Sequence, residues 1–269
     1  MSEDDIKNGR NFLKNINWMK GGRIESDQMK KIPSPPLQKP YPEGTPLVDL
    51  IEPEDFKIGN IALIDVINKR RTRRKFTKEP LTLEELSFLL WATQGVQQII
   101  GNNSATWRTV PSGGARHPFE TYLYIALVDG IQPGLYRYLS IEHKLCLVRK
   151  DLNQPFPIDK TLVAKAPIVF IWSVIPYRTE WRYGAFCHKV IAQETGHICQ
   201  NLYLAAESIE AGCCAVGAYY QELMDEYINV DGREEFAVYT ARIGKVKQSD
   251  KSLLRMAETL HGYRSRRQS

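Results

Sequence analysis

The sequence lacks long hydrophobic runs and an apolar leader. Its longest apolar stretch, "APIVFIWSVI" from Ala166 to Ile175, is far shorter than the roughly 20 residues that a membrane helix needs. The first residues, "MSEDDIKNGRNF", are acidic and polar, so we expect no secretory signal. We therefore expect a cytoplasmic protein that does not enter a membrane.

Cysteine is scarce and has no paired spacing. No C-x-x-C pair occurs, which argues against a disulfide framework and against a zinc ribbon. The five cysteines are Cys146, Cys187, Cys199, Cys213 and Cys214. The last two are adjacent, and two interpretations stay open for them: a redox-active pair or two buried, inert thiols.

The motifs of three common enzyme classes are absent as well. The chain has no G-x-S-x-G elbow of an α/β-hydrolase, no G-x-x-x-x-G-K-[ST] phosphate loop and no H-E-x-x-H zinc motif. His188, His197 and Cys199 fall on one predicted helix, but their spacing does not bring them to one face. We therefore expect no metal site.

The composition is that of a globular protein, with 43% hydrophobic and 25% charged residues among 269. The net charge of +5 is too small to indicate nucleic-acid binding by itself. Residues 1–58 carry clustered prolines, "IPSPPLQKPYPEGTP", and predict an extended arm that covers either a partner subunit, which is our hypothesis, or its own domain. One domain is expected over residues 59–248, followed by a basic tail over residues 249–269.

Hydrophobic periodicity predicts a mixture of helices and strands without strict βαβ alternation, which favours an α+β fold. We expect helices at residues 59–71, 81–95 and 185–210, and strands at 121–128, 134–148 (a hairpin), 166–175, 213–220 and 234–246. Thr82 and Glu85 have capping-box spacing, and Gly95 and Gly212 are expected to end their helices. A polar loop is expected after Gly95. The helix at 185–210 is apolar almost all round, as at the centre of a domain or a dimer.

The stretch "NKRRTRRKFTKEP" concentrates positive charge at the end of the first predicted helix. Cations there complement the helix dipole, so a solvated charge cluster is one interpretation. A nucleic-acid surface would need interleaved aromatic residues, and Phe76 alone does not provide them. Arg70, Arg71, Thr72 and Arg74 combine guanidinium groups with a hydroxyl, which is a donor set that suits one phosphate.

The loop "VPSGGARHPFE" has properties that a ligand-binding loop needs. Pro111 restricts φ, Ser112 offers a hydroxyl, and Gly113 and Gly114 let the backbone approach a ligand closely. An ordinary turn is the alternative interpretation of two adjacent glycines. The combination of this loop with the basic stretch favours a ligand that carries phosphate.

In this order, the segments resemble the nitroreductase-like FMN flavoproteins, and more closely their SagB-type dehydrogenase branch. The resemblance rests on "KRRTRRKF", "LSFLLWATQGV", "RTVPSGGARHPFETYL", "PGLYRY" and "TGHICQNLYLAAESIEAGCCAVGAY", and covers roughly Pro46 to Lys245. It implies an α+β domain with a central mixed or antiparallel sheet flanked by helices. It also implies a homodimer with one FMN in each of two clefts at the interface.

The resemblance assigns cofactor contacts to residues that match family motifs. The motif that holds the FMN phosphate and the pyrimidine edge corresponds to Arg70, Arg71, Thr72 and Arg74. The loop that the neighbouring subunit lays along the isoalloxazine corresponds to Pro111, Ser112 and Gly113. The turn whose backbone N–H approaches flavin N5 corresponds to Val216, Gly217 and Ala218. Positive charge near N1 and O2 is expected from Arg74 or Arg116, and a phosphate contact from Lys245 or Lys247.

The activity implied by the resemblance is FMN-dependent, ping-pong hydride transfer through N5, with NAD(P)H reducing the flavin and a small organic acceptor reoxidising it. Because flavin performs the hydride chemistry, the protein needs no acid, base or nucleophile, and we assign no certain catalytic residue. Tyr183, in "RYG", is a candidate proton donor, and an ordinary packing tyrosine is the alternative.

Details of the SagB-type branch leave alternatives open. Arg116 and His117 match its "GARHP" pattern, whereas the Lys-Tyr pair of its azoline dehydrogenases is absent from the chain. An azoline (thiazoline or oxazoline) dehydrogenase is therefore an alternative function. A flavin-binding protein without turnover and a basic nucleic-acid module are two others.

Overall fold

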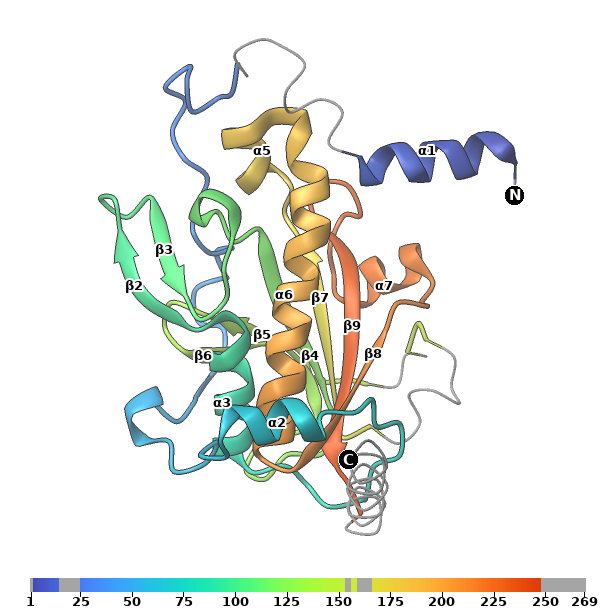
Figure 1. Cartoon of the computed structure of the whole chain (residues 1–269). Coiled ribbons are helices and arrows are strands. Elements are labelled where there is room, and N and C mark those ends of the chain that lie inside the picture. Colours follow the sequence, from blue (N-terminus) through green and yellow to red (C-terminus); the bar gives the residue numbers. More distant parts are fainter. Residues whose placement is uncertain (1, 15–24, 153–155, 159–165, 248–269) are drawn as a thin grey trace, which may run out of the picture.

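A computed structural model describes residues 2–14, 25–152, 156–158 and 166–247. Its centre is a seven-stranded sheet in the order β1-β6-β5-β4-β7-β9-β8, in which all neighbouring strands are antiparallel. The strands are β1 (Leu47–Asp49), β4 (Phe119–Ile125), β5 (Gly134–Leu139), β6 (Lys144–Arg149), β7 (Ile168–Val174), β8 (Ala211–Val216) and β9 (Phe236–Lys245). Helices flank this sheet (Figure 1), so the predicted α+β fold is confirmed.

The central strand β7 is covered on both faces of the sheet and is therefore apolar on both. All residues of its sequence, "IVFIWSV", are buried. Ile168, Phe170 and Trp172 belong to the core that α3 (Leu83–Gln94) and α6 (Cys187–Ser208) cover, whereas Val169 and Ile171 belong to a second core with residues of α7 (Gln221–Tyr227). Side chains alternate between the faces of a strand, so a strand covered on both sides is apolar throughout.

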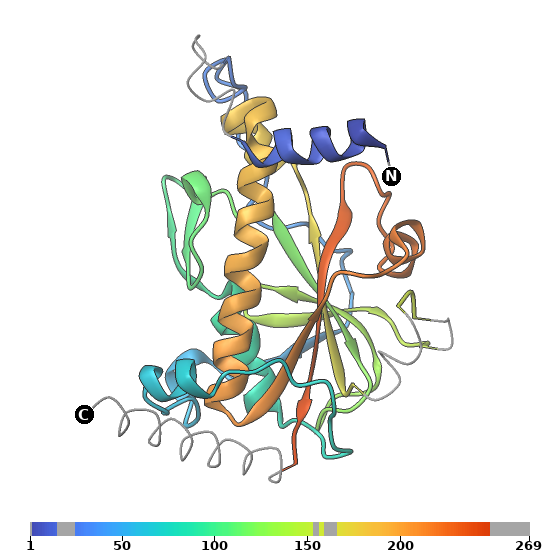
Figure 2. The ribbon, with the colours of Figure 1, turned by 45° about the vertical axis from the view of Figure 1, so that its right-hand side comes forward.

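The long helix α6 (Cys187–Ser208) crosses one face of the sheet, in front of β4, β7 and β9 (Figures 1 and 2). It lies beside α3 (Leu83–Gln94), and the Asn201 amide joins the two by donating to the carbonyl of Ala92 at 2.9 Å. The same amide donates to the carbonyl of Thr109 at 3.2 Å. The predicted helix at 185–210 is thereby confirmed, and it is the element from which the candidate site is built.

The other helices are short. They are α1 (Glu3–Leu13), α2 (Leu63–Lys69) and α5 (Tyr177–Tyr183), with the 3₁₀ turns η1 (Pro53–Asp55), η2 (Gly113–Ala115) and η3 (Gly184–Phe186). The helical spacing of apolar residues predicted α2 correctly, but Val66 alone among the residues of this helix is buried. Leu63, Ile64 and Ile67 are exposed by 62%, 65% and 52%. The apolar side of α2 is therefore available to a partner.

The capping box at the start of α3 is confirmed. The hydroxyl of Thr82 accepts from the N–H of Glu85 at 3.1 Å, and the Glu85 carboxylate accepts from the N–H of Thr82 at 2.9 Å. Gly95 follows the last residue of the helix, as predicted. This reciprocal pair satisfies two backbone donors that a helix start otherwise leaves without a partner.

Three local predictions are wrong. The arm expected to be extended over residues 1–58 contains the helix α1, which begins with a capping box at Ser2 and Asp5. The expected polar loop after Gly95 is a hairpin of β2 (Val96–Ile100) and β3 (Ala105–Arg108) that projects from the sheet (Figure 1). Asn102 and Asn103, which have positive φ, turn its chain. Gly212 lies within β8 rather than at the end of a helix, and Glu210, with φ of 58°, makes the turn after α6.

The described part of the proline-rich arm lies on its own domain. β1 extends the sheet by pairing with β6, and the carbonyl of Pro40 accepts from the Arg137 guanidinium at 3.0 Å. Lys39 donates from its ammonium to Glu235 at 2.5 Å and from its backbone N–H to Glu120 at 2.9 Å. Coverage of a partner subunit by the arm stays a prediction.

Among the described residues, none of the helices combines the length and the apolar character that crossing a membrane would require.

Candidate functional site

The basic stretch is held at the edge of the sheet by backbone bonds. Thr72 forms a parallel bridge with Cys213 of β8, and the N–H of Arg73 donates to the Cys213 carbonyl at 2.9 Å. α2 ends at Lys69, so the chain becomes extended at the residues that sequence analysis singled out. The side chains of the stretch therefore project beside β8 and the C-terminal half of α6.

The arginines of this stretch have different surroundings. Arg73 forms an ion pair with Glu207 of α6 at 3.0 Å, where both side chains are 11% exposed. The guanidinium of Arg70 lies over the ring of Tyr203 at 5.6 Å. Arg71 and Arg74 are exposed. Within the described parts of the chain, no carboxylate pairs with Arg70, Arg71 or Arg74.

Tyr203, which was not among the predicted site residues, connects three elements at this edge. Its hydroxyl accepts from the N–H of Ala215 in β8 at 2.9 Å and hydrogen-bonds to the hydroxyl of Thr72 at 3.3 Å. Burial raises the pKa of the Tyr203 phenol, so the group stays neutral. The signal was present in "NLYLAAES", where a polar aromatic interrupts an apolar helix face.

The turn after β8 brings exposed backbone to the same side. The Val216 carbonyl accepts from the Thr240 hydroxyl at 2.7 Å, which ties the end of β8 to β9. Gly217 and Ala218 follow and are exposed. A Cβ on Gly217 would lie 3.9 Å from the ring of Tyr239, an ordinary van der Waals distance, so the turn lies beside that ring. Thr72 and Gly217 thus lie toward opposite ends of β8.

The predicted loop "VPSGGARHPFE" is attached to α6 through Glu194, a residue that sequence analysis missed. The Ser112 hydroxyl donates to Glu194 at 2.9 Å and the Gly113 N–H donates to the other carboxylate oxygen at 2.5 Å. The Ser112 oxygen also accepts from the N–H of His117 at 2.9 Å. Glu194 is 3% exposed, and burial raises its pKa although these two donors act against the shift. Pro111 lies exposed at the start of the loop.

Glycine is required at position 114 of this loop. Gly114 has φ of +61°, and a Cβ there would approach the Arg182 side chain to 2.5 Å and the Tyr183 hydroxyl to 2.8 Å. Tyr183 therefore lies beside the glycines of the loop. The guanidinium of Arg182 stands over its ring at 5.6 Å.

Arg116 and His117 are buried within their own subunit. Arg116 donates to the carbonyls of Ser104 at 2.7 Å and Gly114 at 3.1 Å, and stacks over Trp181 at 5.1 Å. Burial, with the nearby Arg182, lowers the pKa of Arg116. Burial and neighbouring arginines lower the pKa of His117 to about 3, so its imidazole is neutral at pH 7.

The loop and the basic stretch do not meet within one chain. The loop contacts α6 at Glu194, whereas Arg70 and Thr72 contact it at Tyr203. Nine residues separate these contacts, which is about 13 Å along a helix that rises about 1.5 Å per residue. A group as small as one phosphate therefore cannot contact both within one chain.

Lys245 has an internal partner in this structure. Its ammonium forms an ion pair with Glu85 at the start of α3, and the lysine side chain is 19% exposed. Lys247 is exposed at the end of the described residues. Of the two predicted phosphate contacts, Lys247 is thus the one without a described ion pair.

The cysteines are all buried as free thiols. Burial raises the pKa of Cys213 well above 9.0, which leaves little reactive thiolate at neutral pH. Glu180, Cys187 and His188 bring potential metal-ligand atoms within 4.8 Å of one another. Burial raises the pKa of the Cys187 thiol to about 12, however, and the His188 ring is hydrogen-bonded to Glu180 at 2.9 Å.

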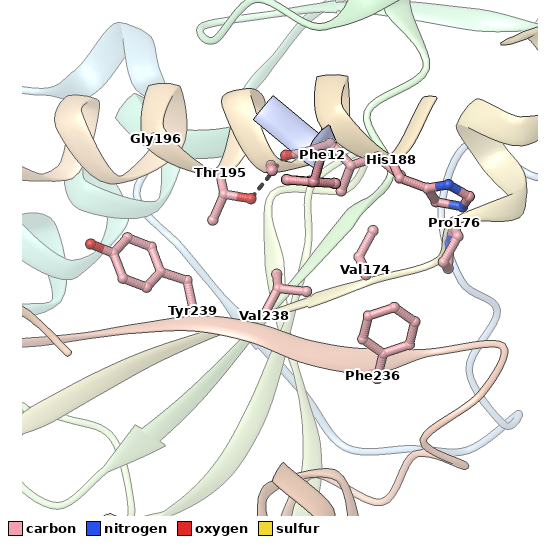
Figure 3. A pocket seen from close by; sticks show the side chains of 11 residues that line it. Phe12, Val174, Pro176, His188, Thr195, Gly196, Phe236, Val238 and Tyr239 are labelled. Carbon is pink, nitrogen blue, oxygen red and sulfur yellow. Dashed lines mark hydrogen bonds between the residues drawn. The ribbon is translucent and has the colours of Figure 1, made fainter. Parts of the chain in front are cut away.

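A cavity of about 560 Å³ lies between the N-terminal half of α6 and β9 (Figure 3). Ile191, Ala192, Thr195 and Gly196 line it from the helix, with His188 at its rim. The facing residues are Phe236, Val238 and Tyr239 of β9, with Val174 and Pro176. Tyr239 also lies near the exposed turn after β8, since a Cβ built on Gly217 would be 3.9 Å from its ring.

Comparison with known proteins identifies related sequences. The model of the Nitroreductase family matches residues 67–245. A Methanocaldococcus jannaschii protein, provisionally named a nitroreductase, is 32% identical over 201 residues, which are 73% of this chain and 98% of that protein. The trifolitoxin-processing protein TfxB of Rhizobium leguminosarum bv. trifolii is 26% identical over 133 residues, which are 46% of this chain and 36% of that protein.

Solved structures share the fold. A Ralstonia eutropha protein, described provisionally as a nitroreductase, has a TM-score of 0.63 at 24% identity, covering 80% of this chain and 99% of that one. A chain of the E. coli microcin synthetase McbBCD complex, with truncated pro-MccB17 bound, has a TM-score of 0.56 at 21% identity. That alignment covers 74% of this chain and 77% of the other.

Proposed function

The chain belongs to the Nitroreductase family and is an FMN-dependent oxidoreductase of that family. On this premise we propose which residues of the chain hold FMN and which molecule the enzyme reduces. FMN supplies hydride acceptance and donation at N5 when it is bound. We propose that NAD(P)H donates the hydride and that a small organic molecule in the cytoplasm accepts it.

The observation that carries the proposal is the set of cations beside β8. Arg70, Arg71 and Arg74 have no carboxylate partner in the described chain, whereas Arg73 pairs with Glu207. Guanidinium groups that lack an internal acid, next to the Thr72 hydroxyl, suit the phosphate of FMN in charge and in donor number. Tyr203 holds the Thr72 hydroxyl at this place.

The exposed turn after β8 suits the flavin ring. Val216 is bonded to β9, so the backbone of Gly217 and Ala218 is held in position while its surface stays open. Thr72 pairs with Cys213, four residues before Gly217. An extended strand covers about 13 Å over four residues, a span that an extended nucleotide can cover.

We propose that a second subunit completes the site as a homodimer. Pro111, Ser112 and Gly113 are held about 13 Å along α6 from Tyr203, so within one chain this loop does not reach the phosphate set. Apolar surface for an interface is present on α2, where Leu63 and Ile64 are exposed by 62% and 65%. Arg116, which binds two carbonyls of its own subunit, would support the loop.

No protein acid is assigned to the reaction by this arrangement. Tyr183 lies at the glycines of the loop, so in a dimer it would approach the flavin of the partner as a proton donor. We retain this role for Tyr183 as a proposal. Lys245 is bonded to Glu85, and in the proposed site it orients α3 beside the phosphate set.

The proposal is tested by the visible absorption spectrum of the purified protein, followed by acid release of the bound nucleotide. One FMN per chain, reducible by NADH or NADPH under nitrogen, is the expected result. A colourless protein that does not take up added FMN would reject the assignment.

Azoline dehydrogenation is a second candidate function. Its support is the similarity to the trifolitoxin-processing protein and the "GARHP" pattern at Arg116 and His117. Under oxygen, such an enzyme would remove two hydrogens from a thiazoline-containing peptide. A loss of about two daltons from the peptide would support this function, and an unchanged mass with the FMN-loaded protein would argue against it.

A further inference from the structure

The cavity between α6 and β9 contains a side chain from the far end of the sequence. Phe12, at the end of α1, is one of the residues that line it, and Figure 3 shows its ring facing Thr195 and Val174. The carbonyl of Leu13 accepts from the Lys189 ammonium at 2.5 Å, which brings the end of α1 to α6. No residue of α1 is buried. The helix is therefore attached to the domain mainly near this cavity.

The walls of the cavity select for apolar groups. Val174, Pro176, Ile191, Phe236 and Val238 supply aliphatic and aromatic surface. The polar side chains among the lining residues already have partners within the chain. The Thr195 hydroxyl donates to the Ile191 carbonyl at 2.9 Å, and the His188 ring is bonded to Glu180 at 2.9 Å. The walls therefore offer a ligand mainly apolar contact.

The cavity is larger than one aromatic ring. Its volume is about 560 Å³ in a structure where Phe12 already lines it. A cavity of about 150 Å³ is enough to bind benzene, so space for a second ring remains. Tyr239 lies at the end of the cavity opposite Pro176 and His188 (Figure 3), and its ring is close in space to Gly217.

We propose that this cavity binds an aromatic group of the second substrate, and that Phe12 competes with that group from within the same chain. The assignment of the ligand to the reaction rests on the proposed function, because the turn at Gly217 marks where the flavin would lie. The competition between Phe12 and an aromatic molecule does not depend on the flavin.

The contact of Phe12 is weak enough to be displaced. Its side chain remains 48% exposed, so it gains about half of the transfer free energy of a phenylalanine. An interaction of this size makes a difference of about fivefold in an equilibrium constant. Phe12→Ala should therefore tighten the binding of an aromatic probe about fivefold.

The test measures the affinity of the full chain for the probe para-fluorobenzyl alcohol. Binding is monitored by fluorine NMR, with and without added FMN. The variant Phe12→Ala is compared with Ile6→Ala, a matched change on α1 at a residue outside the cavity that is 39% exposed. Ala192→Trp adds a large side chain at an exposed helix position that lines the cavity. A third sample carries para-fluorophenylalanine at position 12.

We expect Phe12→Ala to tighten probe binding, Ile6→Ala to leave it unchanged and Ala192→Trp to abolish it. The resonance of the label at position 12 should move toward its unfolded value as the probe is added. Equal affinities in Phe12→Ala and the unaltered protein, or a label that does not respond to a bound probe, would overturn the proposal. Failure of FMN to bind, with these probe results intact, would reject the proposed function and leave the competition standing.

Discussion

Replacing Glu194 with alanine should release the loop that carries Ser112 and Gly113. The carboxylate accepts a hydrogen bond from each of these residues, at 2.9 Å and 2.5 Å, and is 3% exposed. Each hydrogen bond to a charged acceptor contributes about 1.5–3 kcal/mol. Relief of the buried charge offsets part of that sum, so we expect Glu194→Ala to lower the free energy of unfolding by about 2–3 kcal/mol.

Glu194→Gln removes the negative charge of the side chain but keeps nearly the same shape. The amide keeps one acceptor for the Gly113 N–H, but it presents an NH₂ group toward Ser112. We expect a smaller loss, about 1 kcal/mol at pH 7. The glutamine variant also has no carboxyl group to titrate, which makes it the control for pH dependence.

The pH dependence follows from the direction of the pKa shift. Burial, the largest cause, raises the pKa of Glu194 above its ordinary 4.5. The folded protein then binds this proton more tightly than the unfolded chain does. The stabilisation from the neutral carboxyl group is complete below pH 4.5 and is lost as the pH rises through the folded pKa.

Urea denaturation at several pH values between about 4 and 7.5 measures the free energy of unfolding of the wild type and of Glu194→Gln, and thus the difference between the two. The stability of the wild type relative to the glutamine variant should fall as the pH rises. A difference that grows with pH would refute the reasoning, because it would mean that the two donors lower the pKa by more than burial raises it.

Three further predictions concern stability and reactivity. Lys39→Met should lower the unfolding free energy by about 1–3 kcal/mol in urea denaturation, because Glu235 loses its cationic partner; an unchanged midpoint would contradict the role of the arm. Tyr203→Phe should cost about 1–2 kcal/mol in the same assay, since the Ala215 N–H loses its acceptor. Buried thiols such as Cys213 should react with Ellman's reagent only as fast as the protein unfolds, and immediate reaction in native buffer would favour a redox-active pair.

Much of the fold could be predicted because its signals are local. The capping box at Thr82 and Glu85 and the continuous apolar run of β7 each depend on a few neighbouring residues. The hairpin of β2 and β3 was missed because its strands are polar on the exposed side, although the turn sequence with Asn102 and Asn103 was visible. At Gly212, tertiary pairing of β8 with β9 determined the structure, and Glu210 adopted the left-handed conformation instead.

The candidate site could be predicted only in part. Family motifs pointed to Arg70, Thr72 and Gly217, which the structure brings to the edge of the sheet along β8. They did not point to Tyr203 or Glu194, because each acts on residues about 80 to 130 positions away in the sequence. The position of α1 over the cavity depends in the same way on contacts between distant segments.

The central claim is that the cations beside β8 hold the phosphate of FMN. Fluorescence titration with FMN and with riboflavin, which has no phosphate, tests it in the unaltered protein, in Arg71→Ala/Arg74→Ala and in the control Lys78→Ala. We expect a clear preference for FMN that the double variant loses and the control keeps, with riboflavin affinity unchanged throughout. Equal affinities for FMN and riboflavin in the unaltered protein would contradict the claim.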